Sequence, residues 1–288
     1  MLASTSAVGQ PRDLGVADGT VVGMVIDRQL VDDFRRDGVV CVRGLLEPSV
    51  VEKARRGIDK VLADPGPLAI AASGEDDPGR FVEDFCRWPE IAEIESVARD
   101  RHVGAAVAAL LGAEELRLYH DHVLVKEPGT RQRTPWHQDQ PYYNVDGTQG
   151  ASVWAPVDPV AEDGSLEVIA GTHLGPWLMP RTFLANEARW FPEGSLAEMP
   201  DIEADRSRHP IRRWALEPGD AVIFHMLSVH GAPGFTGPGR RRVLSLRYLG
   251  DDVVHAPRRW RTSPEFEGLA DELPPGAPMD HPRFPRVT

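Results

Sequence analysis

The feature that most constrains the fold is a change of texture at Gly112. After it, short apolar and β-branched segments follow one another, with Gly, Pro and Asp turns between them. The 27 glycines and 26 prolines among 288 residues exceed the roughly 12% that these two types usually supply, and they disfavour a bundle of long helices. Short strands separated by turns are typical of an antiparallel sandwich or barrel. The expected strands cover residues 116–126, 152–157, 165–169, 212–216, 221–224 and 242–248.

The part before Gly112 has helical periodicity. Apolar residues fall on one face of 27–38, 48–64 and 90–111, and a β-branched strand is expected at 39–46. The prediction is a mainly β fold with flanking helices. Its expected parts are a mobile leader over 1–22 and one domain over 23–288, which divides into a helical part 23–112, a β core 113–252 and a tail 253–288. Residues 176–210 lack periodicity and are interpreted as a lid insertion.

Composition excludes several classes of function. The formal charge of −12 disfavours nucleic acids and anionic membrane surfaces as partners. Cys41 and Cys86 are too few for a disulfide framework or a four-cysteine zinc site, so they are expected to be reduced core residues. No apolar run approaches the roughly 20 residues of a membrane span. The first residues lack the basic and apolar regions of a secretory signal, which favours a cytoplasmic protein.

The segment TPWHQDQPYY places His137 and Asp139 two residues apart. In a strand both side chains point to one face and can reach one metal ion. The segment PGDAVIFHMLSVHG offers His225 or His230 as a third ligand. Two histidines and one carboxylate on one face form the triad of non-haem Fe(II) oxygenases, whose open positions accept O2 and a co-substrate. A His-X-Asp tripeptide is common by chance, so the prediction of a metal site depends on the residues around it.

A basic cluster, Arg240–Arg242, follows about ten residues after His230. An arginine can hold a carboxylate through two charge-assisted hydrogen bonds. A metal triad with an arginine nearby therefore suits a small dicarboxylate that chelates iron at one end and forms a salt bridge at the other.

From about residue 27 to 248 the chain resembles the phytanoyl-CoA dioxygenase family of Fe(II)/2-oxoglutarate oxygenases, which includes ectoine hydroxylase. The resemblance rests on the order and spacing of several segments: DRQLVDDFRRDGVVCVRGLL, VLVKEPG, WHQDQ, SVWAPVD, DGSLEVIAGTH, PGDAVIFH and VHGAPGFTGPGRRRVLSLRY. It implies that 23–288 is a single dioxygenase domain whose core is a double-stranded β-helix, the cupin-like jelly roll.

The resemblance also implies roles by position. His137, Asp139 and His230 match the iron ligands, and Arg241, eleven residues past the distal histidine, matches the 2-oxoglutarate arginine. Further matches are Lys126, a co-substrate contact, and Gln138 and Trp154, which line the active site. Many members carry a serine that contacts the co-substrate two residues after the distal histidine, and this chain has Ala232 there.

Other residues have weaker claims. Five aromatic residues are candidates for substrate contact, although packing explains the first three equally well: Trp136, Tyr142, Tyr143, Trp190 and Phe191. The histidines outside the triad are assigned ordinary structural or surface roles, among them His120, His122, His173 and His225. The run 258–261 (RRWR) is interpreted as a solvated segment, given the negative net charge.

The expected function is an Fe(II)/2-oxoglutarate-dependent dioxygenase that uses O2 to hydroxylate an unactivated C–H bond, with succinate and CO2 as products. The substrate class is a small or mid-sized metabolite, and the expected state is a monomer or homodimer. Asp139 favours hydroxylation over halogenation, since related halogenases replace this carboxylate. Three alternatives stay open: a cupin-type binding protein, a zinc hydrolase, and an acyl-CoA hydroxylase of the same family, whose CoA group would want a basic groove.

Overall fold

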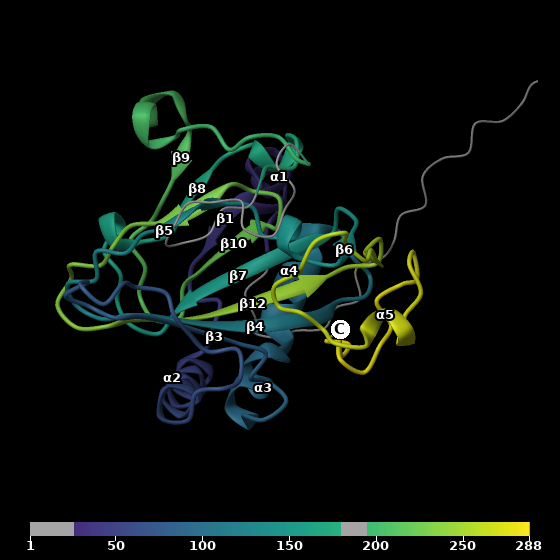
Figure 1. Cartoon of the computed structure of the whole chain (residues 1–288), viewed down its shortest axis with the longest axis horizontal. Helices are drawn as coiled ribbons and strands as arrows, with labels where there is room; N and C mark the ends of the chain where they lie inside the picture. The colour runs from purple at the N-terminus through teal and green to yellow at the C-terminus, as the bar shows by residue number, and fades with distance from the viewer. Residues whose placement is uncertain (1–25, 180–194, 288) are drawn as a thin grey trace, which may run out of the picture.

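The computed structural model describes residues 26–179 and 195–287. The proposed leader and two of the substrate candidates, Trp190 and Phe191, lie outside the described residues. Figure 1 shows two β-sheets with helices against the outer face of the larger sheet. Among the described residues, no helix has both the length and the apolar surface that crossing a bilayer requires.

The large sheet has seven strands in the order β1-β10-β7-β12-β4-β3-β2, and every neighbouring pair is antiparallel. Its strands are β1 (Val39–Val42), β2 (Ile70–Ala71), β3 (Phe81–Phe85), β4 (Arg117–Lys126), β7 (Gly150–Pro156), β10 (Ala221–His225) and β12 (Arg241–Leu249). The expected strand at 39–46 is thus only half as long, because the chain turns at Gly44, where φ is +61°.

The small sheet has the order β5-β11-β8-β9. Its strands are short: β5 (Thr134–His137), β8 (Glu167–Ile169), β9 (Ile211–Arg212) and β11 (His230–Ala232). A separate pair joins β6 (Val145–Asp146) to β13 (Val254–His255). Side chains of both sheets, among them Trp154, Phe224 and Val168, pack into one buried cluster between them. The predicted jelly roll is therefore confirmed.

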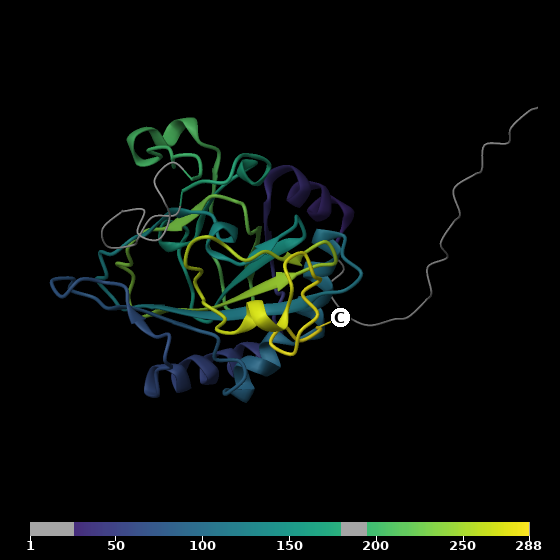
Figure 2. The same ribbon diagram turned by 45° about the vertical axis from the view of Figure 1, so that its right-hand side comes forward.

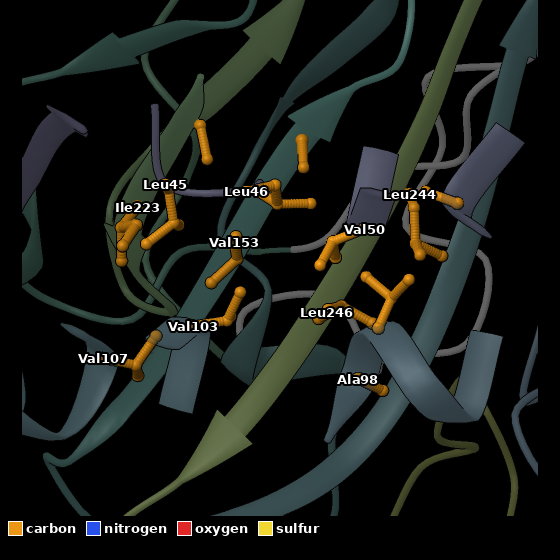
Figure 3. Packing of buried hydrophobic residues seen from close by; sticks show 14 of the residues in the cluster. Leu45, Leu46, Val50, Ala98, Val103, Val107, Val153, Ile223, Leu244 and Leu246 are labelled. Atoms are coloured by element: carbon orange, nitrogen blue, oxygen red, sulfur yellow. The ribbon is translucent and has the colours of Figure 1, made fainter. Parts of the chain in front are cut away.

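The helices cover the outer face of the large sheet (Figures 1 and 2). They are α1 (Arg28–Asp37), α2 (Pro48–Ala63), α3 (Ala92–Ala98) and α4 (Arg101–Leu111), whereas the short α5 (Leu269–Glu272) packs with the tail in a separate cluster around Tyr119. Figure 3 shows the apolar residues that join this layer to the sheet, such as Val103 and Val107 of α4 against Val153 of β7. The single helix expected at 90–111 is wrong: Asp100 accepts hydrogen bonds from the N–H groups of His102 and Val103, which starts α4 as a new helix.

The described residues also contain the 3-10 turns η1 (Gln140–Tyr142), η2 (Glu162–Gly164), η3 (Thr172–Leu174) and η4 (Glu203–Arg208). The described parts of the 176–210 insertion pack against the small sheet, since Ile202 shares a buried cluster with Trp136, Ile169 and Val229. The tail is part of the core. Its residues Leu269, Met279 and Phe284 are buried against Tyr119, and the N–H of Val287 donates to the carbonyl of Leu116.

Candidate metal centre

Three side chains meet between the sheets. One ligand atom each from His137, Asp139 and His230 lies within 4.8 Å of the other two, and this is the one such group among the described residues. His137 ends β5 and His230 begins β11, and the two are cross-strand partners. The Oδ1 of Asp139 lies 3.6 Å from the Nε2 of His137 and 3.7 Å from that of His230.

Asp139 does not lie in a strand, which corrects the expectation that β5 carries both motif residues. The strand ends at His137, and Asp139 has helical backbone angles at the start of η1. Its N–H donates to the carbonyl of Met226, which follows β10. This contact anchors the turn that brings the carboxylate to the two imidazoles.

Backbone carbonyls orient both imidazoles. The Nδ1 of His137 lies 2.8 Å from the carbonyl oxygen of Pro135, and that of His230 lies 3.0 Å from the carbonyl oxygen of Ser228. Because a carbonyl oxygen only accepts, each Nδ1 carries the hydrogen and each Nε2 keeps its lone pair. Both lone pairs are thus available at the side of the ring that faces Asp139.

The protonation states suit a divalent cation. Burial, and then the neighbouring His137, lower the pKa of His230 to about 3, so its imidazole is neutral. Burial acts to raise the pKa of Asp139, but Arg247 and the two imidazoles outweigh it and hold the pKa well below its usual range. The Oδ2 of Asp139 accepts a hydrogen bond of 2.7 Å from the Ser152 hydroxyl, which leaves Oδ1 for a metal. A neutral imidazole at His230 and an ionised carboxylate at Asp139 are donors of the kind that a facial-triad iron site uses.

A cavity reaches from His137 and His230 to Arg241. The residues that line it are Glu83, His122, Leu124, Thr134, His137, Trp154, Leu166, Phe224, His230, Ala232, Arg241, Ser245 and Arg247. The Arg241 guanidinium is buried near the rings of Trp154 and Phe235. Its Cζ lies 5.7 Å from the Trp154 ring centroid and 5.8 Å from that of Phe235. One Nη donates to the carbonyl of Gly164, and Nε has no hydrogen-bond partner in the described part of the chain. This end of the cavity therefore presents an unpaired cationic donor.

Lys126 is the cross-strand partner of Arg241. Its ammonium donates to the carbonyls of Gln132 and Pro233, at 2.8 and 2.9 Å, and so joins the chain before β5 to the chain after β11. Two of its three N–H bonds are used in this way. A direct contact with a co-substrate stays a prediction.

Trp154 lies in the cavity wall, whereas two other candidates do not. The Gln138 side chain donates to the carbonyl of Leu227 and accepts from the N–H of Leu178, which ties the insertion to the sheets. Trp136 packs with Ile169 and Ile202, and its indole N–H donates to Glu203. Both residues flank His137, so they project away from the face that His137 presents. Neither side chain lines the cavity, so an active-site role for Gln138 and a substrate contact for Trp136 stay predictions.

The two tyrosines after the motif have different surroundings. The ring of Tyr142 lies edge-on to His137, with centroids 5.9 Å apart. The hydroxyl of Tyr143 accepts a hydrogen bond of 3.1 Å from the Nε of Arg247, deep in the protein. Tyr142 is thus the candidate nearer to the metal ligands, and Tyr143 supports another side chain.

Several cavity residues were not identified from the sequence. His122 was assigned a surface or core role, yet it lines the cavity, and its Nε2 lies 3.5 Å from the Oε1 of Glu83. Ser245 and Arg247 lie on the same face of β12 as Arg241. Strand alternation could have identified them, because every second residue of a strand lies on one face. His122 shares a face with Lys126 on β4, and Arg247 shares one with Arg241 on β12.

The remaining histidine assignments hold. The ring of His225 accepts from the N–H of Leu227 and lies 2.6 Å from the Thr148 carbonyl, and His173 lies 3.2 Å from the carbonyl of Arg35. The run 258–261 is not wholly solvated, because Arg258 donates to the carbonyls of Tyr143 and Val145. Cys41 and Cys86 are both free thiols and half-buried.

The family model and two curated relatives that match this chain all carry the name phytanoyl-CoA dioxygenase. The family model for phytanoyl-CoA dioxygenase (PhyH) matches residues 34–243. A probable phytanoyl-CoA dioxygenase of Caenorhabditis elegans is 26% identical over 209 residues, which cover 69% of this chain and 59% of the relative. The peroxisomal phytanoyl-CoA dioxygenase of Rattus norvegicus is 23% identical over 240 residues, covering 77% and 68%. The chain thus matches about three-fifths of the length of the nematode relative.

Solved structures share the fold. The non-heme alpha ketoglutarate dependent carbocyclase SnoK from nogalamycin biosynthesis has a TM-score of 0.71 and 22% identity, covering 91% of this chain and 97% of SnoK. The epimerase SnoN in complex with Fe3+, alpha ketoglutarate and nogalamycin RO has a TM-score of 0.72 and 21% identity, covering 90% and 98%. EctD from S. alaskensis with 2-oxoglutarate and 5-hydroxyectoine has a TM-score of 0.60 and 21% identity, covering 78% and 76%.

Proposed function

The chain belongs to the phytanoyl-CoA dioxygenase family, and from this premise we propose that it is an Fe(II)- and 2-oxoglutarate-dependent dioxygenase. The observation that carries the proposal is one buried cavity lined by His137 and His230, which form a ligand cluster with Asp139, and by Arg241, whose Nε has no partner among the described residues. Ligands for iron and a clamp for a dicarboxylate are thereby joined in a single space.

The residues of the chain hold and orient the reactants. Iron bound by the triad, with 2-oxoglutarate and O2, would supply the oxidising chemistry that yields succinate, CO2 and a hydroxylated substrate. His137 and His230 present Nε2 because their Nδ1–H groups are held by carbonyls, and Asp139 presents Oδ1 because Ser152 holds Oδ2. Arg241, buried in the cavity wall, would pair with the distal carboxylate of 2-oxoglutarate, and the buried walls would exclude water from the site.

A small or mid-sized metabolite is the proposed substrate class. The printed names of SnoK, SnoN and EctD connect this fold with nogalamycin and ectoine chemistry, and SnoK and SnoN match nearly all of this chain. Hydroxylation is the proposed outcome because Asp139 keeps the carboxylate ligand. A carbocyclase and an epimerase among the neighbours make ring closure and epimerisation the alternative outcomes. A cytoplasmic location and a monomeric or homodimeric state stay predictions of the sequence.

The second candidate is an acyl-CoA hydroxylase, which the printed names of the nematode and rat relatives favour. The acidic net charge of −12 disfavours a site for the polyanionic CoA group. Succinate release stimulated by phytanoyl-CoA, and not by the corresponding free acid, would select this candidate.

Succinate formation tests the proposed activity. Protein with Fe(II), 2-oxoglutarate and O2 should form succinate, slowly without substrate, and each of the three additions should be required. The variant His230→Ala should lose this turnover because one metal ligand is gone. Equal succinate formation by the wild type and this variant, or none by either, would reject the proposal.

A further inference from the structure

A second buried guanidinium belongs to the cavity, at the end that holds the metal ligands. Arg247 is 5% exposed and lines the cavity together with Arg241, six residues earlier on the same strand. Even spacing along β12 places both side chains on the face that looks toward the small sheet. Neither the sequence motifs nor the proposed function assigns a role to Arg247.

Two contacts fix the position of Arg247. Its Nε donates a hydrogen bond of 3.1 Å to the hydroxyl of Tyr143, and its Nη2 lies 3.5 Å from the Oδ2 of Asp139. The same carboxylate oxygen accepts from Ser152. Arg247 therefore helps to hold Asp139 with Oδ1 turned toward the two imidazoles.

The third nitrogen of this guanidinium has no such role. The Nη1 of Arg247 is buried and has no hydrogen-bond partner within the described residues, and the same holds for the hydroxyl of Ser245, which also lines the cavity. Buried N–H groups without a partner are uncommon and costly, more so when they carry charge. The cavity thus has an unsatisfied donor beside the metal ligands as well as one at Arg241.

We propose that Arg247 binds the metal-end carboxylate of 2-oxoglutarate through Nη1 while it positions Asp139 through Nη2. The inference rests on the proposed function and adds to it a second carboxylate contact. Each carboxylate of the dicarboxylate then has its own guanidinium, Arg247 at the metal end and Arg241 at the distal end. Tyr143 is a positioning residue, since it acts on the ligand only through the Nε of Arg247.

Ligand binding to the Co(II) protein, which does not turn over, distinguishes the contacts at the two ends of 2-oxoglutarate. The experiment uses protein saturated with Co(II), without O2, and measures the Kd of 2-oxoglutarate and of pyruvate by calorimetry. Pyruvate has the metal-end carboxylate and keto group but no distal carboxylate. Arg247→Met should weaken both ligands by roughly tenfold or more, as expected for a lost charged hydrogen bond, whereas Arg241→Met should weaken 2-oxoglutarate alone.

Three further variants control the measurement. Arg242→Met removes the neighbouring arginine, which pairs with Asp158 and Asp59 outside the cavity, and should leave both Kd values unchanged. Arg247→Lys should recover part of the loss. Tyr143→Phe keeps both charged groups, and it should weaken both ligands less than Arg247→Met and alter the visible spectrum of bound Co(II) through Asp139. These two variants also serve if Arg247→Met does not fold.

The outcomes distinguish this inference from the proposed function. If Co(II) wild type binds neither 2-oxoglutarate nor pyruvate, the proposed function fails. If it binds both, and the Arg247 variants bind pyruvate as tightly as the wild type, only the role of Arg247 is rejected. A loss confined to 2-oxoglutarate would likewise reject it, because Arg247 would then act at the distal carboxylate.

Discussion

The nitrogen that each metal-ligating imidazole presents is decided by local backbone. In both cases Nδ1–H donates to the carbonyl of the residue two positions earlier, Pro135 for His137 and Ser228 for His230. Because the partner is only two residues away, each contact depends on the local backbone and on no distant part of the chain. The ligand atoms are therefore pre-oriented before a metal binds.

Arg241 is predicted to control the requirement for 2-oxoglutarate. Its guanidinium is buried in the cavity, whereas Arg240 pairs with Glu127 at the surface and Arg242 pairs with Asp158. Arg241→Ala should raise the 2-oxoglutarate concentration for half-maximal succinate formation by roughly 10- to 100-fold, as expected for a lost charged hydrogen bond. Arg240→Ala and Arg242→Ala should change it little, and equal effects at the three positions would contradict the assignment.

Glu83 should make stability fall between about pH 5 and 8. Burial raises the pKa of Glu83 from 4.5 to about 8, against the charges of Lys126 and Arg247. Over that window the unfolded chain releases this proton and the native protein keeps it, so unfolding becomes easier as the pH rises. The variant Glu83→Gln lacks this contribution, and its thermal midpoint relative to the wild type should increase from pH 5 to pH 8. A constant difference between the two midpoints would refute this.

At the scale of residues, motif spacing correctly grouped His137, Asp139 and His230, and Arg241 lines the cavity that the two histidines share. The spacing did not place Gln138 in the cavity, because that side chain bonds the Leu227 carbonyl and the Leu178 N–H instead. His122 and Arg247 were missed for another reason. Alternation shows which residues share a face, but packing of the second sheet decides that this face is the buried one.

The elements that hold the ligands are among the shortest in the protein. β5 has four residues and β11 has three, and they are defined by their pairing with each other and with β8. So short a segment has no measurable periodicity, which explains why the strand expected through Asp139 ends at His137 and why β11 was not predicted. The longer β4 and β12 were predicted almost to their ends.

Two glycines that end helices offer a matched test of an element boundary. Gly38 after α1 and Gly112 after α4 have φ of +70° and +66°. A Cβ on Gly112 would meet nothing within 4 Å, whereas one on Gly38 would lie 2.3 Å from the His173 ring and 2.6 Å from the Ser228 hydroxyl. Ser228 also donates to the carbonyl of Gly38, in the segment just before His230.

Gly112→Ala should therefore cost only the left-handed backbone penalty of about 1–2 kcal/mol. Gly38→Ala adds overpacking, typically about 1–3 kcal/mol, and should be the more destabilising of the two. Urea denaturation measures both free energies of unfolding. Equal losses would show that the contact between α1 and the η3 turn can relax without cost.

At the scale of the whole molecule, buried basic side chains at one cavity contrast with an acidic net charge. The net charge is −12, yet Arg241 and Arg247 both line one buried cavity, and Lys126 is buried as the cross-strand partner of Arg241. The helical periodicity before Gly112 and the short apolar segments after it predicted the helices and the β core in this order. The integration of the tail did not, because Phe284 and Val287 contact residues more than 160 positions earlier, and no local pattern encodes such a contact.

Metal binding should stabilise the whole fold, because it joins β5 to β11 only in the native state. At a Co(II) concentration of 100 times Kd the gain is about 2.7 kcal/mol, which corresponds to a rise of several degrees in Tm. His230→Ala should show little of this rise. Thermal unfolding with and without Co(II) measures the difference, and an equal rise in the variant would place the metal elsewhere.

The central claim is that iron at this triad binds 2-oxoglutarate directly while Arg241 holds the far carboxylate. The most direct measurement is the visible spectrum of the Fe(II) protein during anaerobic titration with 2-oxoglutarate. The account predicts a new metal-to-ligand charge-transfer band in the wild type, a higher half-saturation concentration in Arg241→Ala, and no band in His230→Ala. A wild-type spectrum that 2-oxoglutarate leaves unchanged would contradict it.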